Sequence, residues 1–311
     1  MKRRQFLEYA GAAGLSLAMA EKTTALVNPP IYPLDLSTVE FEVTTVDRRG
    51  QVKQRQPHRA RYFTDAINGT EFLTMVAVPS GRFWMGAAPT EAQTQSYEFP
   101  RHRVKLPRFF LSQYPITQAQ WAAVATLPKI RYDLNSSPSY FQGKDRPVES
   151  VSWLEAVEFC DRISQQTGRH YQLPSEAQWE YACRAGTRTP FNTGETITSQ
   201  LADYMGTTPY RAEAIGDYRQ STMAVGRLSA NAFGLYDMHG NVWEWCADVW
   251  HANYRGAPRH GQGWASSRPS QRRTIRGGSW LNSPAQIRSA SRSGYDQTAL
   301  NRTIGFRVSL S

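Results

Sequence analysis

The C-terminal segment, residues 276–308, contains the residues best suited to chemistry at a surface. It opens with Arg276-Gly277-Gly278-Ser279-Trp280, contains Arg288-Ser289-Ala290 and closes with Ile304-Gly305-Phe306-Arg307-Val308. Paired glycines before a serine and a large aromatic residue indicate a backbone packed too closely for a Cβ atom. Small and polar residues without a hydrophobic period lie between these anchors. A loop held between rigid anchors commonly presents a binding or catalytic surface, so we expect the functional surface here.

The residues of this segment favour ligand binding over catalysis. Ser279 has no base near it in the sequence, and Asp296 is the only carboxylate of the segment. We therefore assign no catalytic residue. Small polar side chains and a tyrosine on a rigid backbone resemble the binding surface of an antibody. The candidate ligand-binding residues are Trp280, Leu281, Asn282, Ser283, Gln286, Ser291, Ser293, Gly294, Tyr295 and Thr303.

One buried carboxylate is expected upstream of this segment. Alternation along a strand places Trp243 and Trp245 on one face and Glu244 on the other, with Val242 and Cys246. A carboxylate among apolar neighbours must be paired or bound to a metal ion. Glu244 is therefore expected either to coordinate a metal or to pair with an arginine.

The remaining polar and aromatic residues favour structural roles. Histidines occur without the tight spacing of metal ligands, and we interpret His239, beside Gly240, as structural. We expect the arginines of the C-terminal segment to pair with buried carboxylates and backbone carbonyls; they are Arg276, Arg288, Arg292 and Arg307. Five tryptophans are interpreted as core residues: Trp84, Trp121, Trp153, Trp179 and Trp243. Two more lie near the segment and are candidates for a ligand cleft: Trp264 and Trp280.

Short strands and three helices must position these residues. Capping boxes that begin at Thr117 and Ser152 predict two helices, the second ending at Gly168. A third helix is predicted to begin at Pro174-Ser175-Glu176-Ala177 and to end at Gly186. Alternating or apolar stretches predict the strands. They cover residues 39–46, 51–54, 76–79, 81–86, 104–110 and 242–249, with a final half-buried strand at Phe306 and Val308.

The N-terminus carries an export pattern. Lys2-Arg3-Arg4-Gln5-Phe6-Leu7 precedes a weakly apolar stretch that ends in Ala18-Met19-Ala20. This pattern predicts a twin-arginine signal peptide over residues 1–20 and export through the twin-arginine translocase. We therefore expect a periplasmic or secreted protein. Residues 21–70 are interpreted as a linker with an N-terminal β-hairpin extension, and residues 71–311 as the main domain.

Composition excludes several classes of protein. The chain has 311 residues and a formal charge of +10, but its arginines are scattered and follow no helix face beside stacking aromatics, so we expect no nucleic-acid partner. No stretch after the signal approaches the roughly 18 apolar residues of a membrane span. Only three cysteines occur, and we interpret all three as buried core residues: Cys160, Cys183 and Cys246.

Six phrases in sequence order resemble the formylglycine-generating enzyme (sulfatase-modifying factor) family from about residue 71 to 308. They are Phe83-Trp84-Met85-Gly86, Pro115-Ile116-Thr117, Val151-Ser152-Trp153, Leu173-Pro174-Ser175-Glu176-Ala177-Gln178-Trp179-Glu180-Tyr181, Gly234-Leu235-Tyr236-Asp237-Met238 with Gly240-Asn241-Val242-Trp243-Glu244-Trp245, and the C-terminal anchors.

This resemblance implies an irregular, loop-rich α+β domain related to the C-type lectin fold, with structural calcium. All-oxygen ligation suits calcium. One calcium site is implied at Asp237, the carbonyls of Gly240 and Val242, and Glu244; a second is implied at Asp203.

Copper chemistry is not expected, because the two cysteines of the copper-dependent oxidases correspond here to Asn282 and Ile287, and Cu(I) prefers thiolates. Cys160 and Cys183 match positions that form disulfides with tail cysteines in some members, and the tail has none. We expect both to be reduced, and a direct bond between them stays open.

Three functions compete on these grounds. The first is an exported scaffold that binds an unknown protein or small-molecule ligand through the C-terminal segment, as in the targets of diversity-generating retroelements. The second is a periplasmic oxidoreductase acting on a non-sulfatase substrate such as a siderophore, as the resemblance to cysteine-lacking, twin-arginine-exported relatives implies. The third is a structural domain whose ancestral site has decayed. Formylglycine generation is the least favoured activity.

Overall fold

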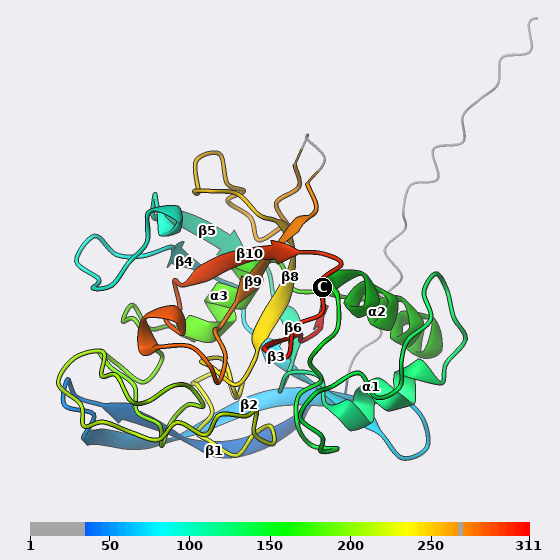
Figure 1. Cartoon of the computed structure of the whole chain (residues 1–311), viewed down its shortest axis with the longest axis horizontal. Helices are drawn as coiled ribbons and strands as arrows, with labels where there is room; N and C mark the ends of the chain where they lie inside the picture. Colours follow the sequence, from blue (N-terminus) through cyan, green and yellow to red (C-terminus); the bar gives the residue numbers. More distant parts are fainter. Residues whose placement is uncertain (1–34, 267–269) are drawn as a thin grey trace, which may run out of the picture. The chain divides into compact units, whose positions relative to one another are not determined.

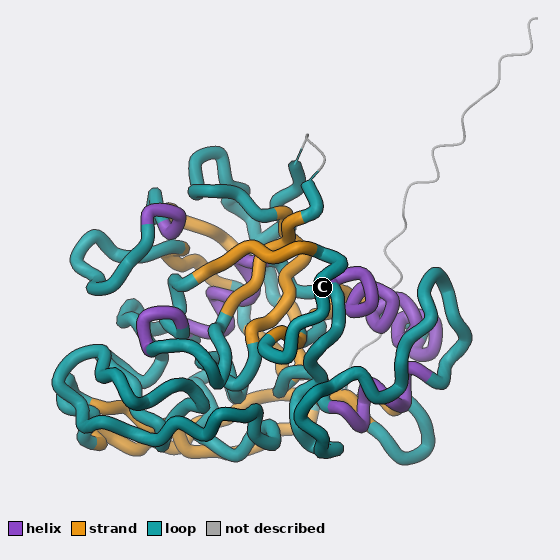
Figure 2. The backbone as a smooth tube through the Cα atoms, in the orientation of Figure 1, coloured by secondary structure: helices purple, strands orange, loops and turns teal. Residues whose placement is uncertain are grey.

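Short strands joined by long loops dominate the computed structural model of this chain, which describes residues 35–266 and 270–311. Figure 1 and Figure 2 show three sheets, with a few helices beside them. This arrangement confirms the expected irregular, loop-rich α+β class. Within the described residues, no helix combines the length and the apolar character needed to cross a membrane. The signal-peptide prediction for residues 1–20 lies outside the described residues.

The largest sheet has six strands in the order β1-β2-β3-β6-β12-β7. Its first hairpin confirms the predicted strand over residues 39–46, and its return strand is far longer than residues 51–54. Because β2 also pairs with β3, the hairpin is continuous with the rest of this sheet. The strand bounds are Ser37–Val46 for β1, Val52–Ala66 for β2, Phe72–Val78 for β3, Phe109–Ser112 for β6, Tyr171–Gln172 for β7 and Ser309–Leu310 for β12.

A second sheet brings the C-terminal segment against the strand that contains Glu244. Its order is β10-β9-β8-β11, with β11 parallel to β8 and the other pairs antiparallel. The sequence analysis identified β8 but missed β9 and β10, which are rich in arginine and lack an apolar alternation. A third sheet pairs β4 with β5. The bounds are Trp243–Val249 for β8, Arg272–Arg276 for β9, Arg292–Asp296 for β10, Ile304–Gly305 for β11, Gly81–Met85 for β4 and His102–Leu106 for β5.

The two predicted capping boxes are present, the third helix also begins with one at Ser175, and the three helices begin where the sequence places them. In each box the Thr or Ser side chain accepts from the backbone three residues on, and a Glu or Gln side chain bonds back to the cap. Gly168 ends α2 with φ 70°, as predicted, whereas Ala185 at φ 43° ends α3 one residue before Gly186. The helices are α1 Gln118–Ala125, α2 Trp153–Thr167 and α3 Glu176–Arg184; the 3-10 turns are η1 Ser96–Glu98 and η2 Pro284–Gln286.

Two strand predictions were wrong. The stretch 104–110 is divided at Pro107 between β5 and β6, which belong to different sheets; proline has no N–H for a ladder. The expected final strand at Phe306 and Val308 is a fully buried connection between β11 and β12. Arg307 between them is also buried, because a carboxylate neutralises it, so the inside–outside alternation of a half-buried strand is absent.

Trp84 corrects the interpretation of the tryptophans. Its side chain is 42% exposed, whereas Trp121 and Trp179 are fully buried. Strand β4 alternates, and Met85 points into the core, so Trp84 faces outward.

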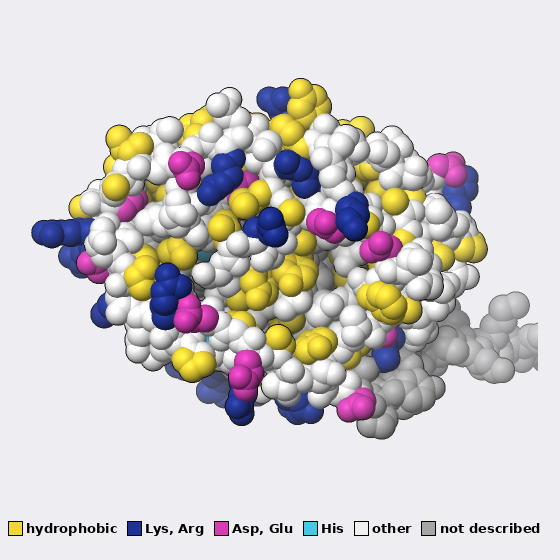
Figure 3. Space-filling view, turned by 90° about the horizontal axis from the view of Figure 1, so that it is seen from below, with side chains coloured by type: hydrophobic (Ala, Val, Ile, Leu, Met, Phe, Trp, Pro, Cys, Tyr) yellow, Lys and Arg dark blue, Asp and Glu magenta, His cyan; other side chains and the backbone are white. Residues whose placement is uncertain are grey.

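Basic side chains are scattered on the face that contains β1 and β2. Figure 3 shows Lys and Arg interspersed with Asp and Glu there, around a central group of hydrophobic side chains. On this face, the positive charge of the chain is not gathered into one strip.

A buried ion pair connects the end of the chain to β8. The Arg307 guanidinium donates to both oxygens of Glu244, at 2.6 and 2.8 Å, and both side chains are fully buried. The Trp179 indole on α3 donates to the same carboxylate at 2.6 Å. Arg307 also donates to the carbonyls of Ser112 and Tyr236. One guanidinium therefore joins segments from distant parts of the sequence.

The Glu244→Gln variant should lose about 3–5 kcal/mol of unfolding free energy, because it leaves the Arg307 charge buried without a counterion. Urea unfolding measured by circular dichroism checks this. The matched control is Glu42→Gln, which breaks the exposed pair with Arg55, whose side chains are 54% and 58% exposed; it should change stability by about 1 kcal/mol or less. Equal midpoints for the two variants would contradict a structural role for the buried pair.

Candidate functional site

The turn after β9 confirms the prediction that its two glycines allow close packing. Gly277 and Gly278 have φ of 96° and 71°, a region that other residues rarely adopt. A Cβ atom on Gly277 would lie 2.9 Å from the Trp179 ring, and one on Gly278 would collide with Ile287. The turn thus packs directly on α3 and on the middle of the C-terminal segment.

A short loop follows this turn and fixes Asn282, which the resemblance matches to the first cysteine of the copper-dependent oxidases. The Asn282 side-chain oxygen accepts from the Ser279 hydroxyl at 2.7 Å and from the Ser279 backbone N–H at 2.9 Å. The Asn282 carbonyl accepts from the Met205 N–H. Ile287, at the second position, is fully buried. Neither position provides a metal-binding thiolate.

Aromatic side chains surround the start of the segment. Trp280 is 3% exposed and contacts Phe141 at 5.3 Å and Tyr218 at 6.4 Å between ring centroids. The Arg302 guanidinium lies over both Trp280, at 5.6 Å, and Tyr140, at 5.3 Å. Tyr140 is 64% exposed. We call these five residues the Trp280 patch; the sequence analysis missed all but Trp280, because loop residues show no period.

The ten candidate ligand-binding residues divide by exposure. Leu281 is 43% exposed and Gln286 is also exposed. Four are partly exposed: Asn282, Ser283, Ser293 and Tyr295. The other four are buried: Trp280, Ser291, Gly294 and Thr303.

Contacts explain the buried members. The Ser291 carbonyl accepts from Arg276, the Thr303 hydroxyl donates to Asn301, and Gly294 lies against the Trp250 ring, where a Cβ atom would collide. These positions support the backbone. The exposed surface that the structure offers for binding consists of residues 281–283, Gln286 and the adjoining part of the Trp280 patch.

The arginines of the segment are buried and paired, as the sequence analysis expects. Arg288 donates to both oxygens of Glu98, at 2.6 and 2.9 Å, and to Glu91 at 2.6 Å. Arg292 donates to both oxygens of Glu176, at 2.6 and 2.8 Å. Such two-point pairs fix orientation as well as neutralise charge. These pairs therefore anchor the C-terminal segment on its buried side.

Arg276 completes this set through helix α3. It donates to Glu180 and lies 3.4 Å from a Glu176 oxygen. Glu176 and Glu180 are one helical turn apart, so one face of α3 presents both carboxylates to the segment. The sequence analysis did not identify these partners, although their spacing in the predicted third helix was the available signal.

The implied calcium site at Glu244 does not fit the observed contacts. Both Glu244 oxygens accept from Arg307, and Trp179 adds a third bond, so the arginine alternative describes this carboxylate. Asp237, which shares the implied site, accepts from the Gly226 N–H at 2.8 Å, and burial raises its pKa to about 6.

Asp203, the second implied calcium ligand, has a different environment. It is 1% exposed, and within the described residues neither carboxylate oxygen has a hydrogen-bond partner. Arg219 lies 3.6 Å away and also approaches Asp217, at 3.8 Å. Burial raises the pKa of Asp203 to about 7. A buried carboxylate with so little compensation fits a hard cation.

All three cysteines are free and buried, which confirms the expectation that they are reduced core residues. Burial raises the pKa of the Cys183 thiol to about 12 and the pKa values of Cys160 and Cys246 well above the usual range. Burial therefore favours the neutral thiol over the nucleophilic thiolate at all three positions.

Comparisons with known proteins agree with the resemblance seen in the sequence. The family model for the sulfatase-modifying factor enzyme 1-like domain matches residues 64–311. Chaperone protein LppX of Paenibacillus barcinonensis is 27% identical over 258 residues, covering 70% of this chain and 85% of that protein. Formylglycine-generating enzyme of Thermomonospora curvata is 28% identical over 229 residues, covering 58% of this chain and 73% of that protein. The solved structure of PvdO from Pseudomonas aeruginosa has a TM-score of 0.68 and 32% identity, covering 80% of this chain and 98% of that chain.

His239 supports the C-terminal segment from inside and supplies a pH test. Its Nδ1 lies 2.6 Å from the Ile287 carbonyl oxygen, and its Nε2 lies 3.1 Å from the Asn192 nitrogen. The neutral ring satisfies both, donating from Nδ1 and accepting at Nε2. Burial lowers the pKa of His239 to about 4.

Acid should therefore destabilise the fold through His239. Below about pH 6.5 this histidine takes up a proton in the unfolded chain, whereas in the folded protein it stays neutral until about pH 4. Its contribution to stability is therefore fully present above pH 6.5 and is lost as the pH falls. The expected loss from this residue is about 3 kcal/mol. His239→Asn should flatten the slope of unfolding free energy against pH over this window. The exposed control His260→Asn should keep the wild-type slope, and equal slopes in both variants would contradict the assignment.

Proposed function

This chain belongs to the sulfatase-modifying factor enzyme 1-like family, and on that premise we propose that it is an exported scaffold that binds an unknown protein or small-molecule ligand. The binding surface is the exposed part of the C-terminal segment. The observation that carries the proposal is the division of this segment into buried, paired arginines and the exposed or partly exposed side chains that lie between them. Such a division supports a fixed backbone with replaceable surface side chains.

Formylglycine-generating oxidase activity is not part of this proposal. Asn282 is bonded to Ser279 and Ile287 is buried, so the positions of the two family cysteines carry no thiolate. The remaining cysteines are buried as thiols, with pKa values raised by burial. Cu(I) thus lacks the soft ligands that it prefers.

A periplasmic oxidoreductase acting on a non-sulfatase substrate, such as a siderophore, is the second candidate. The Trp280 patch favours it, because Tyr140 and Arg302 could hold an aromatic substrate there. Asp296, the only carboxylate of the segment, is exposed and accepts a hydrogen bond from Thr298. The segment therefore provides no carboxylate that could act as an acid or base in the Trp280 patch. The binding scaffold is therefore the favoured function, and the oxidoreductase is the second.

If the segment is the target of a diversity-generating retroelement, the flanking DNA should contain a near-copy of the stretch that encodes residues 276–308, beside a reverse transcriptase gene. Mismatches should occur at adenines of the copy. They should fall in codons of the exposed and partly exposed candidates, which are Leu281, Asn282, Ser283, Gln286, Ser293 and Tyr295. Sequencing the flanking DNA checks this.

The buried anchors provide the internal control for that experiment. Codons for Arg276, Gly278, Arg288 and Arg307 should match the copy, because a change at any of them removes an ion pair or a required glycine. A copy whose mismatches fall equally on anchors and exposed positions would contradict a preserved backbone. The absence of any copy would remove diversification and shift support to a fixed ligand cleft.

We also propose that Asp203 is a ligand of a structural calcium ion. The support is the buried Asp203 carboxylate, whose oxygens have no hydrogen-bond partner within the described residues, and the raised pKa that burial gives it. Calcium would neutralise this buried charge. The ion has no role in chemistry here.

Calcium should raise the melting temperature of chelator-treated protein, by an amount equivalent to about 2.7 kcal/mol at a hundredfold excess over its Kd. Differential scanning calorimetry with calcium or EDTA measures it. Asp203→Asn should abolish the response, and in EDTA at pH 8 it should melt above wild type, because it removes a buried negative charge. Asp133→Asn is the control, since its carboxylate is 87% exposed. An unchanged melting temperature after chelation of the wild type would reject the site.

A further inference from the structure

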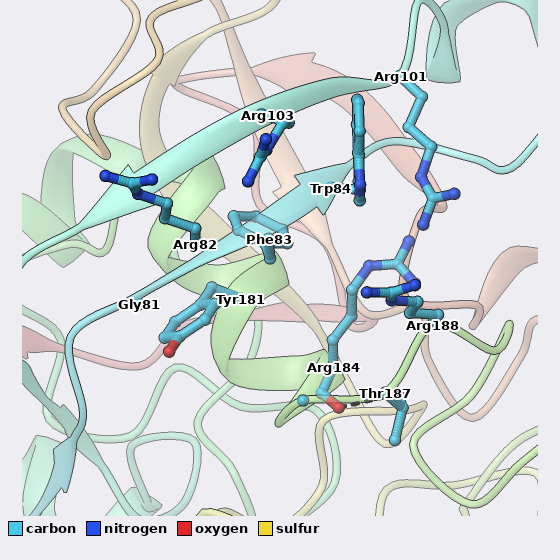
Figure 4. A pocket seen from close by; sticks show the side chains of 11 residues that line it. Gly81, Arg82, Phe83, Trp84, Arg101, Arg103, Tyr181, Arg184, Thr187 and Arg188 are labelled. Carbon is cyan, nitrogen blue, oxygen red and sulfur yellow. Dashed lines mark hydrogen bonds between the residues drawn. The ribbon is translucent and has the colours of Figure 1, made fainter.

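A second site lies away from the C-terminal segment, between the β4–β5 sheet and the end of helix α3. It is a cavity of about 270 Å³, and its lining includes five arginines but, among the described residues, no acidic side chain and no residue of the segment 276–308. Figure 4 shows Arg101, Arg184 and Arg188 extending toward one another beside Trp84. The arginines are Arg82, Arg101, Arg103, Arg184 and Arg188.

Strand register explains why basic and aromatic residues meet here. Arg82 pairs across the sheet with Lys105, and Trp84 with Arg103. Directly opposite residues share a face of an antiparallel sheet, so these four side chains point outward together. The guanidinium groups of Arg101 and Arg103 lie 5.9 and 5.7 Å from the Trp84 ring centroid. The outward position of Trp84, which the sequence analysis placed in the core, creates this surface.

The protein balances the positive charge of the cavity only in part. Glu180 is the carboxylate bonded to Arg184, at 2.8 Å, and it is shared with Arg276 beneath the C-terminal segment. Arg101 has a buried Nε with no hydrogen-bond partner within the described residues. Burial and the nearby positive charges of Arg184 and Arg188 lower the pKa of Arg101, although the carboxylates of Glu180 and Glu91 act in the opposite direction. An anion in the cavity would supply the missing acceptor and relieve the repulsion.

We propose that this cavity binds a small ligand that carries a phosphate or sulfate group. Arg101 and Arg188 hold the tetrahedral anion, Arg184 adds charge from the floor, and Trp84 forms the apolar wall for the organic part. Planar guanidinium groups match the oxygen spacing of such anions. The cavity is near the lower size limit of ligand pockets, so the ligand is small. Its small, partly open form differs from the extended basic strip that a nucleic-acid backbone requires.

Isothermal titration of the full chain with inorganic phosphate, sulfate and phenyl phosphate tests this assignment, at constant ionic strength set with sodium chloride. Arg101→Gln and Arg188→Gln should each weaken binding on the order of tenfold, the loss expected for one charged hydrogen bond. The control Arg61→Gln, exposed on β2, should bind as wild type does. Phenyl phosphate should bind more tightly than inorganic phosphate, and Trp84→Ala should remove the difference. Phosphate and sulfate titrated separately distinguish the two anion chemistries.

Stability without any ligand provides an independent measurement. Arg101→Gln should melt above wild type in phosphate-free and sulfate-free buffer, because it removes a repelled, partly buried charge. Added phosphate should raise the melting temperature of the wild type more than that of the variant at the same concentration, because the variant binds about tenfold more weakly. Equal, weak phosphate binding by all variants, including Arg61→Gln, would overturn the site. Displacement of phenyl phosphate by a short single-stranded DNA oligonucleotide would identify a nucleic-acid backbone and overturn the small-ligand assignment.

Discussion

Buried arginine–carboxylate pairs are the interaction on which this fold depends. Long loops connect the strands and helices of the domain, and some loop carbonyls accept from side chains. The buried guanidinium groups supply such donors: Arg307 bonds the carbonyls of Ser112 and Tyr236, and Arg292 bonds those of Tyr97 and His251. Each charge is neutralised by a buried glutamate, since an unpaired one would cost several kcal/mol. Buried ion pairs therefore stabilise parts of this fold that regular strand hydrogen bonds would stabilise in a protein with more extensive sheets.

This construction separates the structural part of the C-terminal segment from its surface. Arg276, Arg288, Arg292 and Arg307 attach the segment to α3, η1 and β8, and their side chains all point inward. Leu281 and Gln286, which lie between the anchors, have no comparable contacts. A change at such a position alters the surface with little effect on stability. Asn282 and Ile287 also have structural contacts, since the Asn282 side chain bonds to Ser279 within its own loop and Ile287 fills a core site.

Local features were predictable from the sequence, and long-range partners were not. The capping boxes at Thr117, Ser152 and Ser175 use atoms three residues apart, so their sequence pattern determines the structure. The glycine turn was predictable for the same reason. By contrast, Arg288 pairs with Glu98, which is 190 residues away, and no local pattern identifies it. Trp84 was assigned to the core because aromatic residues are usually buried, whereas strand alternation and two neighbouring arginines place it outside. The Trp280 patch was missed because four of its five members come from other loops or the far end of the segment.

Glu180 contacts residues of both the arginine cavity and the C-terminal segment. One of its oxygens accepts from Arg184, at the floor of the arginine cavity, and the other accepts from Arg276, under the C-terminal segment. The first oxygen also accepts from the Gly86 N–H at the end of β4. Proximity of this kind is not evidence of coupling between sites, which requires two states that both ligands bias. What the contacts do establish is that Glu180 cannot be replaced without leaving two buried guanidinium groups and one N–H short of an acceptor. Among the carboxylates of α3, it is therefore the one on which both the cavity and the segment depend.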